Sequence, residues 1–208
     1  PQRSHEPYLF SKDAIAALKI AKNYIMESYG LFNYVHVKNN EIFASNGSYI
    51  YTKKISTVLP DIVLSVEACN VLNEEDYTYY KADNYNFFKT DNTCFGFIKS
   101  EFGTPAYKSI LANGDTGKFF SCQKTDLLKF CGLVNASAKE EMPLSKIFPG
   151  QLLYDEHNFN TKIDCEFKTE GNEDPVEFKF NTKNMSRLIS ALPYETLNFS
   201  KAGPHYKI

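Results

Sequence analysis

The chain has 208 residues, of which 43% are hydrophobic and 15% aromatic, and its formal net charge is −2 at pH 7. These numbers exclude a disordered chain and a DNA-binding protein that is basic over its whole surface. A local basic face on an acidic body is compatible with them, and the length suits one large domain or two small ones.

The five cysteines form no CxxC pair, so nothing in the sequence supports a metal or redox motif. We interpret them as five buried, reduced thiols of a cytoplasmic protein. The four histidines are scattered, and the chain has no HExxH, GxSxG or phosphate-binding glycine motif. We therefore expect no catalysis, no metal and no cofactor. No run of about 18 apolar residues predicts a membrane span, and no signal peptide is recognised after the first residue, Pro1.

In chain order, the first predicted elements are a strand at residues 8–10, a helix with Ser11 as its N-cap, and a strand within residues 31–37. The apolar face of this helix comprises Ala14, Leu18, Ala21 and Ile25. Residues 43–55, FASNGSYIYTKKI, predict a hairpin, because Asn-Gly tolerates the positive φ of a type I′ turn. A strand, a short helix at residues 66–72 and a tyrosine-rich strand follow within residues 62–83.

The same order of elements recurs in the second half of the chain. FFSCQKTDLLKFCGLVNAS, residues 119–137, predicts a strand and a helix whose apolar face comprises Leu127, Leu128, Cys131 and Val134. FKFNTKNMSRLISALPYETLNFSKAG, residues 178–203, predicts a second helix between two strands, with the apolar residues Met185, Leu188, Ile189 and Leu192. Corresponding points lie about 110 to 120 residues apart, a spacing that suits a duplicated domain and is too long for a solenoid repeat.

The repeat predicts two α+β domains, each with few helices and much antiparallel sheet. The join is expected near residues 112–118, which divides the chain into residues 1–114 and 115–208. The second domain has no counterpart to TDNTCFGFIKS, residues 90–100, so we expect its last strand to be missing.

Four segments, in order and spacing, resemble the bacterial DNA polymerase III beta subunit family, the sliding clamp, over its middle and C-terminal domains. FASNGSYIYT, residues 43–52, is similar to that family's ATDGHRLA stretch. FGFIKSEFGTPAYKSIL, residues 95–111, is similar to its segment ending in Phe-Pro-Asp-Tyr, which crosses between the two domains. FSCQKTDLLKFCGLVNAS and FKFNTKNMSRLISAL resemble the two helices of its last domain.

The sequence also departs from that family. Asn46 replaces the usual Asp, Ser48 and Tyr49 replace His-Arg, and Thr104 replaces the Phe before Pro105. We find no equivalent of the family's N-terminal domain or of its C-terminal Met-Pro-Met-like tail. These departures bear on the family's peptide pocket more than on its fold.

The resemblance implies a DNA-clamp fold of two repeated domains, each with two helices on an antiparallel sheet, and a non-catalytic processivity factor. In the family, basic side chains of these helices line a central hole and contact duplex DNA without reading its bases. The DNA-facing residues implied here are Lys12, Lys19, Lys22, Lys124, Lys129, Lys183 and Arg187. The alternative interpretation is that they are ordinary basic residues on the solvent-facing sides of amphipathic helices.

The resemblance also implies a peptide-binding groove, into which polymerases, clamp loaders and repair enzymes of the family insert short peptides. Its residues here would be Ser45, Gly47, Tyr49, Ile50, Pro105, Tyr107 and Ile110, with Phe32 as a further member. The alternative is that Tyr49, Ile50 and Ile110 fill a core beside the hairpin. Because side chains alternate along a strand, at most one of Tyr49 and Ile50 should be plainly buried.

Rings of this class have six domains around the hole. Two domains per chain then imply a homotrimer, whereas a piece of a three-domain clamp implies a dimer. The expected location is the cytoplasm, at a bacterial nucleoid or in a phage-infected cell. The alternative function is a clamp-fold interaction module that binds peptides without forming a ring on DNA. A third hypothesis, an unrelated α+β enzyme, finds no residue set to support it.

Overall fold

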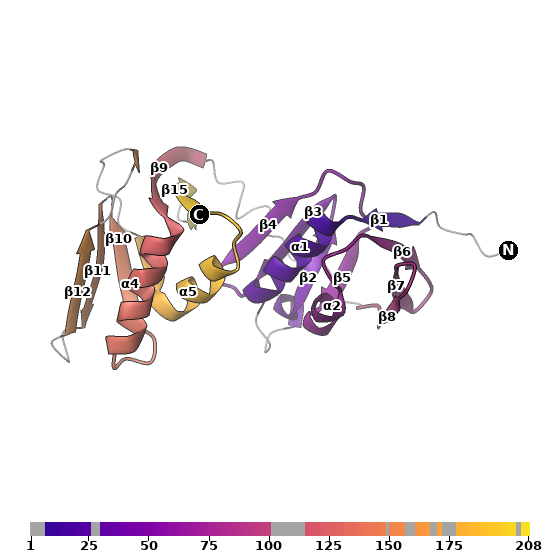
Figure 1. Cartoon of the computed structure of the whole chain (residues 1–208), viewed down its shortest axis with the longest axis horizontal. Helices are drawn as coiled ribbons and strands as arrows, with labels where there is room; N and C mark the ends of the chain where they lie inside the picture. Colours follow the sequence, from indigo (N-terminus) through magenta and orange to yellow (C-terminus); the bar gives the residue numbers. More distant parts are fainter. Residues whose placement is uncertain are drawn as a thin grey trace. The chain divides into compact units, whose positions relative to one another are not determined.

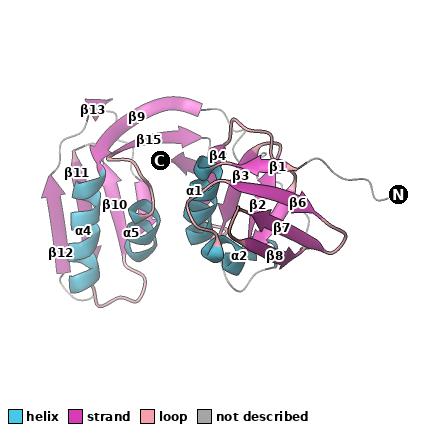
Figure 2. Ribbon diagram, turned by 45° about the vertical axis from the view of Figure 1, so that its right-hand side comes forward, coloured by secondary structure: helices cyan, strands magenta, loops and turns pink. Residues whose placement is uncertain are grey.

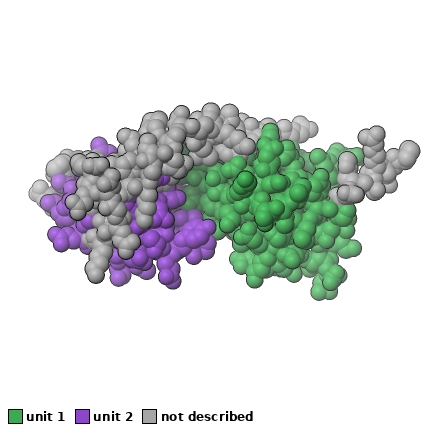
Figure 3. Space-filling model, turned by 90° about the horizontal axis from the view of Figure 1, so that it is seen from above, with its two compact units in different colours: residues 1–105 green, residues 106–208 purple. Residues whose placement is uncertain are grey.

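The computed structural model describes residues 7–25, 30–100, 115–148, 150–156, 161–166, 170–171, 178–202 and 205–208. The chain divides into two compact units, residues 1–105 and 106–208 (Figures 1 and 3). The predicted join at residues 112–118 lies partly outside the described residues. None of the described helices is long and apolar enough to span a membrane.

Unit 1 combines two antiparallel sheets with two α-helices (Figure 2). Its elements are β1 (Tyr8–Phe10), α1 (Lys12–Ala21), η1 (Lys22–Tyr24), η2 (Gly30–Asn33), β2 (Tyr34–Lys38), β3 (Glu41–Ser45), β4 (Ile50–Lys54), β5 (Ile62–Ser65), α2 (Val66–Val71), β6 (Tyr77–Lys81), β7 (Tyr85–Lys89) and β8 (Cys94–Ile98). Sheet 1 has the strand order β1-β6-β7-β8, and sheet 2 has the order β4-β3-β2-β5.

Unit 2 is built from the same kinds of element. They are β9 (Asp115–Gln123), α4 (Lys124–Ser137), β10 (Leu144–Phe148), β11 (Gln151–Glu156), β12 (Thr161–Glu166), β13 (Glu170–Gly171), β14 (Phe178–Asn181), α5 (Thr182–Ser190), β15 (Thr196–Ala202) and β16 (His205–Lys207). Sheet 3 has the strand order β13-β9-β15-β16, and sheet 4 has the order β12-β11-β10-β14.

The two units repeat one topology. Sheets 2 and 4 have equivalent strand orders, and in both units the strand before the first helix pairs with the strand after the second helix, β1 with β6 and β9 with β15. This confirms the predicted α+β class with two repeated domains of two helices each. In each unit, the first and the second half of the sequence both contribute strands to each of the two sheets. Among the described strands, β16 occupies the place of β7, and none corresponds to β8.

Local side-chain caps define where three of the helices begin. Ser11 Oγ accepts a hydrogen bond from the backbone N–H three residues later (3.3 Å), which confirms the predicted N-cap of α1. Ser65 caps α2 in the same way (3.2 Å), and Asn181 Oδ1 caps α5 (2.9 Å). Each cap satisfies one of the backbone donors that a helix leaves unpaired at its start.

The ends of the helices differ in part from the predicted apolar faces. Asn23 Nδ2 donates to the carbonyl oxygens of Lys19 (3.1 Å) and Ile20 (3.2 Å), which satisfies the last turn of α1. Ile25 is buried but lies beyond the helix in extended backbone. In unit 2, Leu192 likewise follows the end of α5, and Leu128 of α4 is only half-buried.

Clusters of aromatic rings fill the cores under sheets 1 and 3. In unit 1, the ring of Phe10 lies 5.0 Å from that of Phe88 and 5.6 Å from that of Tyr79, measured between centroids. All three side chains are fully buried. The buried Tyr79 hydroxyl donates to Asn86 Oδ1 (2.6 Å), so its polar end is satisfied. In unit 2, Phe120 and Phe199 stack at 4.8 Å across the β9–β15 pair.

The turn between β3 and β4 is not the predicted type I′ turn. Gly47 has a φ of +85°, but Asn46 does not have the positive φ that this turn type requires. Asn46 Oδ1 instead accepts hydrogen bonds from the N–H groups of Ser48 (3.0 Å) and Tyr49 (2.8 Å). The Asn side chain therefore shapes a four-residue loop, as in an Asx turn.

Two successive positive φ angles occur instead in the β2–β3 hairpin. Asn39 (52°) and Asn40 (60°) connect the paired residues Lys38 and Glu41. These are the dihedral signs of a type I′ turn, and asparagine is among the few side chains that tolerate them.

The thiols do not all lie in the core. Cys69, Cys122 and Cys131 are buried as predicted, and burial raises the pKa of each from 9.0 to about 12. Cys94 is exposed on β8 and Cys165 is half-exposed on β12, so the prediction of five buried thiols is wrong for these two. Both lie on strands at the edges of their sheets, where alternate side chains face solvent.

The left-handed turn predicts a specific sensitivity at Asn39. Its side chain is exposed, so a substitution there changes the backbone preference and little packing. We expect Asn39→Val to lower the free energy of unfolding by about 1–2 kcal/mol, because a β-branched residue disfavours positive φ. Asn39→Gly is the matched control and should leave stability within about 0.5 kcal/mol of the parent. Urea unfolding measures both, and equal losses in the two variants would contradict this explanation.

The buried thiols predict a loss of stability at alkaline pH. The raised pKa means that the folded chain keeps protons that the unfolded chain releases above pH 9.0, the ordinary thiol value. The free energy of unfolding should therefore be insensitive to these groups below that pH and fall as pH rises toward about 12. Urea titrations under reducing conditions measure this slope. Cys131→Ala should make it shallower, and a slope unchanged by that variant would contradict the assignment.

Candidate nucleic-acid interface

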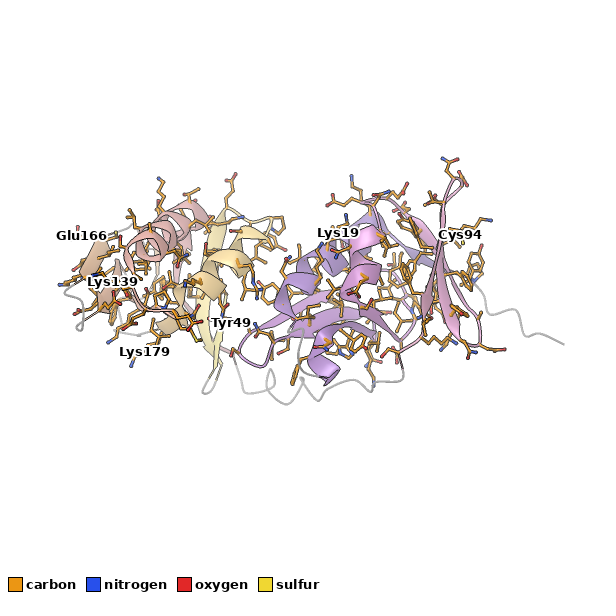
Figure 4. All side chains as sticks on the ribbon, turned by 90° about the horizontal axis from the view of Figure 1, so that it is seen from below. Lys19, Tyr49, Cys94, Lys139, Glu166 and Lys179 are labelled. Carbon is orange, nitrogen blue, oxygen red and sulfur yellow. The ribbon has the colours of Figure 1, made fainter. Side chains whose placement is uncertain are left out.

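Helix α1 buries one face and turns its basic face outward. Ala14, Leu18 and Ala21 are fully buried against the unit's core. Lys12 and Lys19 lie seven residues apart on the opposite face, where Lys12 is exposed and Lys19, labelled in Figure 4, is half-exposed. The helical period therefore places these two predicted residues on one outward stripe.

Two further charges of this region are held by neighbours. Lys22 Nζ, in η1, donates to Asn70 Oδ1 of α2, so it joins the ends of the two helices of unit 1. The carboxylate of Asp13 lies 3.9 Å from Lys53 Nζ of β4. Both partners of this pair are substantially exposed, so it adds little stability, but it reduces the acidic character beside Lys12.

In unit 2, helices α4 and α5 pack side by side (Figure 1). Lys129 of α4 is exposed, opposite the buried residues Leu127, Phe130 and Cys131.

Helix α5 carries its two basic residues one turn apart. Lys183 and Arg187 are exposed at i and i+4, opposite buried Met185, Leu188 and Ile189. Lys183 Nζ also donates to the carbonyl oxygen of Glu141 (2.8 Å).

Lys124 has a structural partner that the sequence analysis did not foresee. Its Nζ donates to the carbonyl oxygens of Leu192 (2.6 Å) and Ser190 (3.3 Å), at the end of α5. A cation at this position satisfies the free carbonyls of a helix C-terminus and interacts favourably with the helix dipole. Lys124 therefore holds the start of α4 to the end of α5, while its role in DNA binding stays a prediction.

Positive charge is concentrated on the helices. Helices α1, α2, α4 and α5 carry six basic residues and three acidic ones, whereas the whole chain has 23 basic and 25 acidic residues. The remaining chain is therefore net acidic. Lysine and arginine on helix surfaces can neutralise phosphates, and such contacts are independent of sequence.

The exposed stripe of α4 also presents Thr125, one turn before Lys129. Its hydroxyl is a possible donor to a phosphate oxygen, a type of contact common in nucleic-acid interfaces. Thr125 is not among the predicted basic contacts, but its position four residues before Lys129 on the predicted helix indicates the same outward face.

The predicted groove is described only in part. Ser45 is buried, and its Oγ accepts from the N–H of Gly47 (3.1 Å), which is exposed at the tip of the loop. Tyr49, Ile50 and Phe32 are half-exposed, so neither Tyr49 nor Ile50 is plainly core. Pro105, Tyr107 and Ile110 lie outside the described residues. A largely apolar side chain that stays half-exposed beside a hydrogen-bonded turn is compatible with a peptide contact.

The described part of unit 1 also contains a cavity of about 430 Å³ between the start of α2 and β8. Tyr34, Ser65, Ala68 and Gly96 are among its lining residues, and none of the described groove residues is. Within the described ranges, no cluster of three or more His, Cys, Asp or Glu side chains could hold a metal ion.

The contacts of Lys124 predict that it stabilises unit 2. We expect Lys124→Met to lower the free energy of unfolding by about 1 kcal/mol, because the carbonyls of Ser190, the last residue of α5, and of Leu192, just after it, lose a charged donor. Lys129→Met removes the same charge from the same helix without that contact and should change stability by less than about 0.5 kcal/mol. Urea unfolding of the two variants compares them, and equal effects would show that the hydrogen bonds of Lys124 contribute nothing.

Comparison with protein-family models and with curated proteins gives no match. Solved structures give many. The DNA polymerase sliding clamp from Pseudomonas aeruginosa is 12% identical and superposes with a TM-score of 0.79, over 97% of this chain and 61% of that chain. The sliding clamp from Bacillus subtilis is 15% identical with a TM-score of 0.75, over 98% of this chain and 60% of that chain.

The DnaN sliding clamp (DNA polymerase III subunit beta) from Bartonella birtlesii, solved bound to griselimycin, is 13% identical with a TM-score of 0.75. The match covers 97% of this chain and 61% of that chain, so this chain spans about three fifths of the length of the clamps it matches. The predicted resemblance is thereby confirmed in three dimensions: the chain has the fold of the bacterial DNA polymerase III beta subunit, the sliding clamp.

Proposed function

We propose that this chain functions as a DNA sliding clamp, a non-catalytic processivity factor that encircles duplex DNA and tethers a replicative polymerase. The observation that carries the proposal is the concentration of basic residues on the outward faces of the helices in a chain of net negative charge. The clamp fold supports it, because it is the fold of proteins named for this activity.

The chemistry of these residues suits sliding. Ammonium and guanidinium groups on flexible stems attract the phosphate backbone at many equivalent positions. Without base contacts, no position on the duplex is preferred, so the protein is free to move along it. Lys12, Lys19, Lys129, Lys183 and Arg187 are the proposed contacts, with Lys22 and Lys124 contributing charge from tethered positions.

Ring closure is part of the proposal. Six domains per ring require three copies of a two-domain chain, or two copies of a longer chain of which these 208 residues form a part. The proposed site of action is the cytoplasm, where the chromosome of a bacterium or an infecting phage is replicated.

We further propose that Ser45, Gly47, Tyr49, Ile50 and Phe32 contribute to a groove for short peptides of a polymerase and a clamp loader. Pro105, Tyr107 and Ile110 are proposed to complete it. The half-exposed Tyr49 and Ile50, beside a loop in which Asn46 Oδ1 accepts two backbone hydrogen bonds, support this assignment.

The second candidate function is a clamp-fold interaction module that binds peptides but forms no ring on DNA. It is favoured by the departures from the family's pocket pattern, where Asn46 replaces Asp, Ser48 and Tyr49 replace His-Arg, and Thr104 replaces Phe. The two candidates differ in topology, because only a closed ring is retained by a DNA molecule that has no ends.

The proposal predicts sequence-independent, salt-sensitive binding to duplex DNA that depends on the helices. Lys12→Gln/Lys19→Gln and Lys183→Gln/Arg187→Gln should each weaken binding to unrelated duplexes equally and lower the salt slope by about one per residue. Fluorescence anisotropy across a salt series measures both quantities. Lys38→Gln/Lys54→Gln removes two charges from sheet 2 and is the matched control. A control effect as large as the helix effect would show that only total charge matters.

Retention on DNA then separates the two candidate functions. A clamp should elute with circular duplex in gel filtration and dissociate once the circle is cut, whereas an interaction module should not distinguish the two forms. Light scattering of the same sample gives the number of copies per assembly. Equal rates of dissociation from circular and from linear DNA would overturn ring closure. The anisotropy series would still test the DNA contacts of the helices separately.

A further inference from the structure

The loop between β3 and β4 contains an Asn-Gly pair with a reactivity of its own. Asn46 is half-exposed, and Gly47 is exposed at the tip of the loop. Asparagine is among the residues that limit the chemical lifetime of proteins, because its side-chain amide reacts with the backbone nitrogen of the next residue. Asn46 and Gly47 therefore form a candidate site of covalent modification that needs no second molecule except water.

The attacking atom at this site, the backbone nitrogen of Gly47, is unhindered. A Cβ added to Gly47 would meet no atom within 4 Å, so the space around this residue is open to water. The φ of +85° is one that a residue with a side chain rarely adopts, so the loop itself favours glycine here. The proton that the nitrogen must lose is held by a neutral hydrogen bond to Ser45 Oγ (3.1 Å).

The group under attack, the side-chain carbonyl of Asn46, is held by two donors. Its Oδ1 accepts hydrogen bonds from the N–H groups of Ser48 (3.0 Å) and Tyr49 (2.8 Å). Negative charge develops on this same oxygen when a nitrogen adds to Cγ. Backbone N–H groups already aimed at such an oxygen lower the barrier, as they do in an oxyanion hole. The Asx turn therefore activates the carbon that has to be attacked.

The leaving group is the side-chain nitrogen of Asn46. The hydrogen bonds of this side chain go to Oδ1, and none to Nδ2 is found within the described ranges. The half-exposed NH₂ group can therefore depart into water without the loss of a contact that holds the loop together.

Other asparagines of unit 1 lack this combination. Asn46 is the only described asparagine that is followed by glycine. Asn39 and Asn40, in the preceding hairpin, are followed by residues with side chains, which crowd the attacking nitrogen. The single hydrogen bond given for Asn40 Oδ1 comes from the N–H of Leu59 (2.9 Å). These two residues are therefore natural controls, only a few positions from Asn46.

We propose that Asn46 is a self-modification site, at which the Gly47 nitrogen attacks Cγ and the asparagine becomes aspartate or isoaspartate. A bond forms between Gly47 N and Asn46 Cγ, and the bond from Cγ to Nδ2 breaks. Nδ2 takes up a proton in exchange for the one that Gly47 N loses, and it leaves as ammonia. Water then opens the cyclic imide, at Cγ to give aspartate or at the main-chain carbonyl carbon of Asn46 to give isoaspartate.

The two products change the hairpin in different ways. Aspartate adds one negative charge and keeps an oxygen that can accept from Ser48 and Tyr49. Isoaspartate routes the main chain through the former side chain, so it lengthens the loop by one carbon between the paired residues Ser45 and Ile50. The modification does not depend on the proposed function, and only its effect on peptide binding in the groove rests on it.

Peptide mapping of the full chain after incubation in heavy-oxygen water at mildly alkaline pH tests the site. Trypsin releases residues 39–53 as one peptide, so fragmentation should locate the exchange of –NH₂ for heavy –OH at Asn46 and leave Asn39 and Asn40 unchanged. Conversion at Asn46 should be as fast in the folded chain as in the urea-unfolded chain, or up to about ten-fold faster, because folding keeps both donors on Oδ1. Slower conversion in the folded chain would overturn the proposal.

A variant and a marker peptide test the mechanism. Gly47→Ala keeps Asn46 but places a methyl group beside the attacking nitrogen, so conversion at Asn46 should slow. Asn113 is also followed by glycine and lies outside the described residues; its own tryptic peptide, residues 109–118, is the reference that should not change. The peptide of Asn46→Asp identifies the aspartate product by its elution. Equal rates in parent and Gly47→Ala, or aspartate without any isoaspartate, would show direct hydrolysis and overturn the attack by Gly47.

Discussion

Each unit depends on the pairing of two strands that lie far apart in the sequence. The strand before the first helix pairs with the strand after the second, through Tyr8 with Tyr79 in unit 1 and Cys122 with Leu197 in unit 2. The same join is reinforced at the helix start, where the N–H of Lys12 donates to Asp76 Oδ1 (2.6 Å) and that of Lys124 to the carbonyl of Glu195 (2.7 Å). The pairing thereby encloses both helices and the intervening strands, which are β2–β5 in unit 1 and β10–β14 among the described strands of unit 2.

That enclosure determines which surface of the helices is available. Because α1 and α5 bury a complete apolar face, their remaining faces are free to carry charge without cost to the core. The basic residues also differ in how freely they can act. Lys124 is held by two carbonyls at and just beyond the end of α5, whereas no such contact is described for Arg187. A basic surface of this kind combines structural and binding residues, and charge alone does not distinguish them.

The helix faces offer charge without aromatic rings, which suits a duplex whose bases are hidden. Sheet 1 shows a different kind of constraint. Gly96 lies opposite Phe87 on β8, and a Cβ there would come within 2.9 Å of Phe87 Cε1, so the position of this ring depends on the missing side chain.

Local patterns in the sequence determined the elements that depend on neighbours along the chain. Ser11 as an N-cap, the helical faces around Leu18 and Leu188, and the repeat of the element order were all predictable, because caps and periodicity act within a few residues. Tertiary structure decided what depends on residues far apart. The division into two sheets follows from β1 pairing with β6 and β9 with β15, and the tether of Lys124 depends on a helix end 66 residues later. The type I′ turn is found at Asn39 and Asn40 and not at Asn46. Asparagine tolerates the conformation at both sites, so the register of the paired strands determines which site adopts it. Cys94 is exposed for a similar reason: its strand lies at the edge of a sheet, and only the pairing of strands determines which one that is.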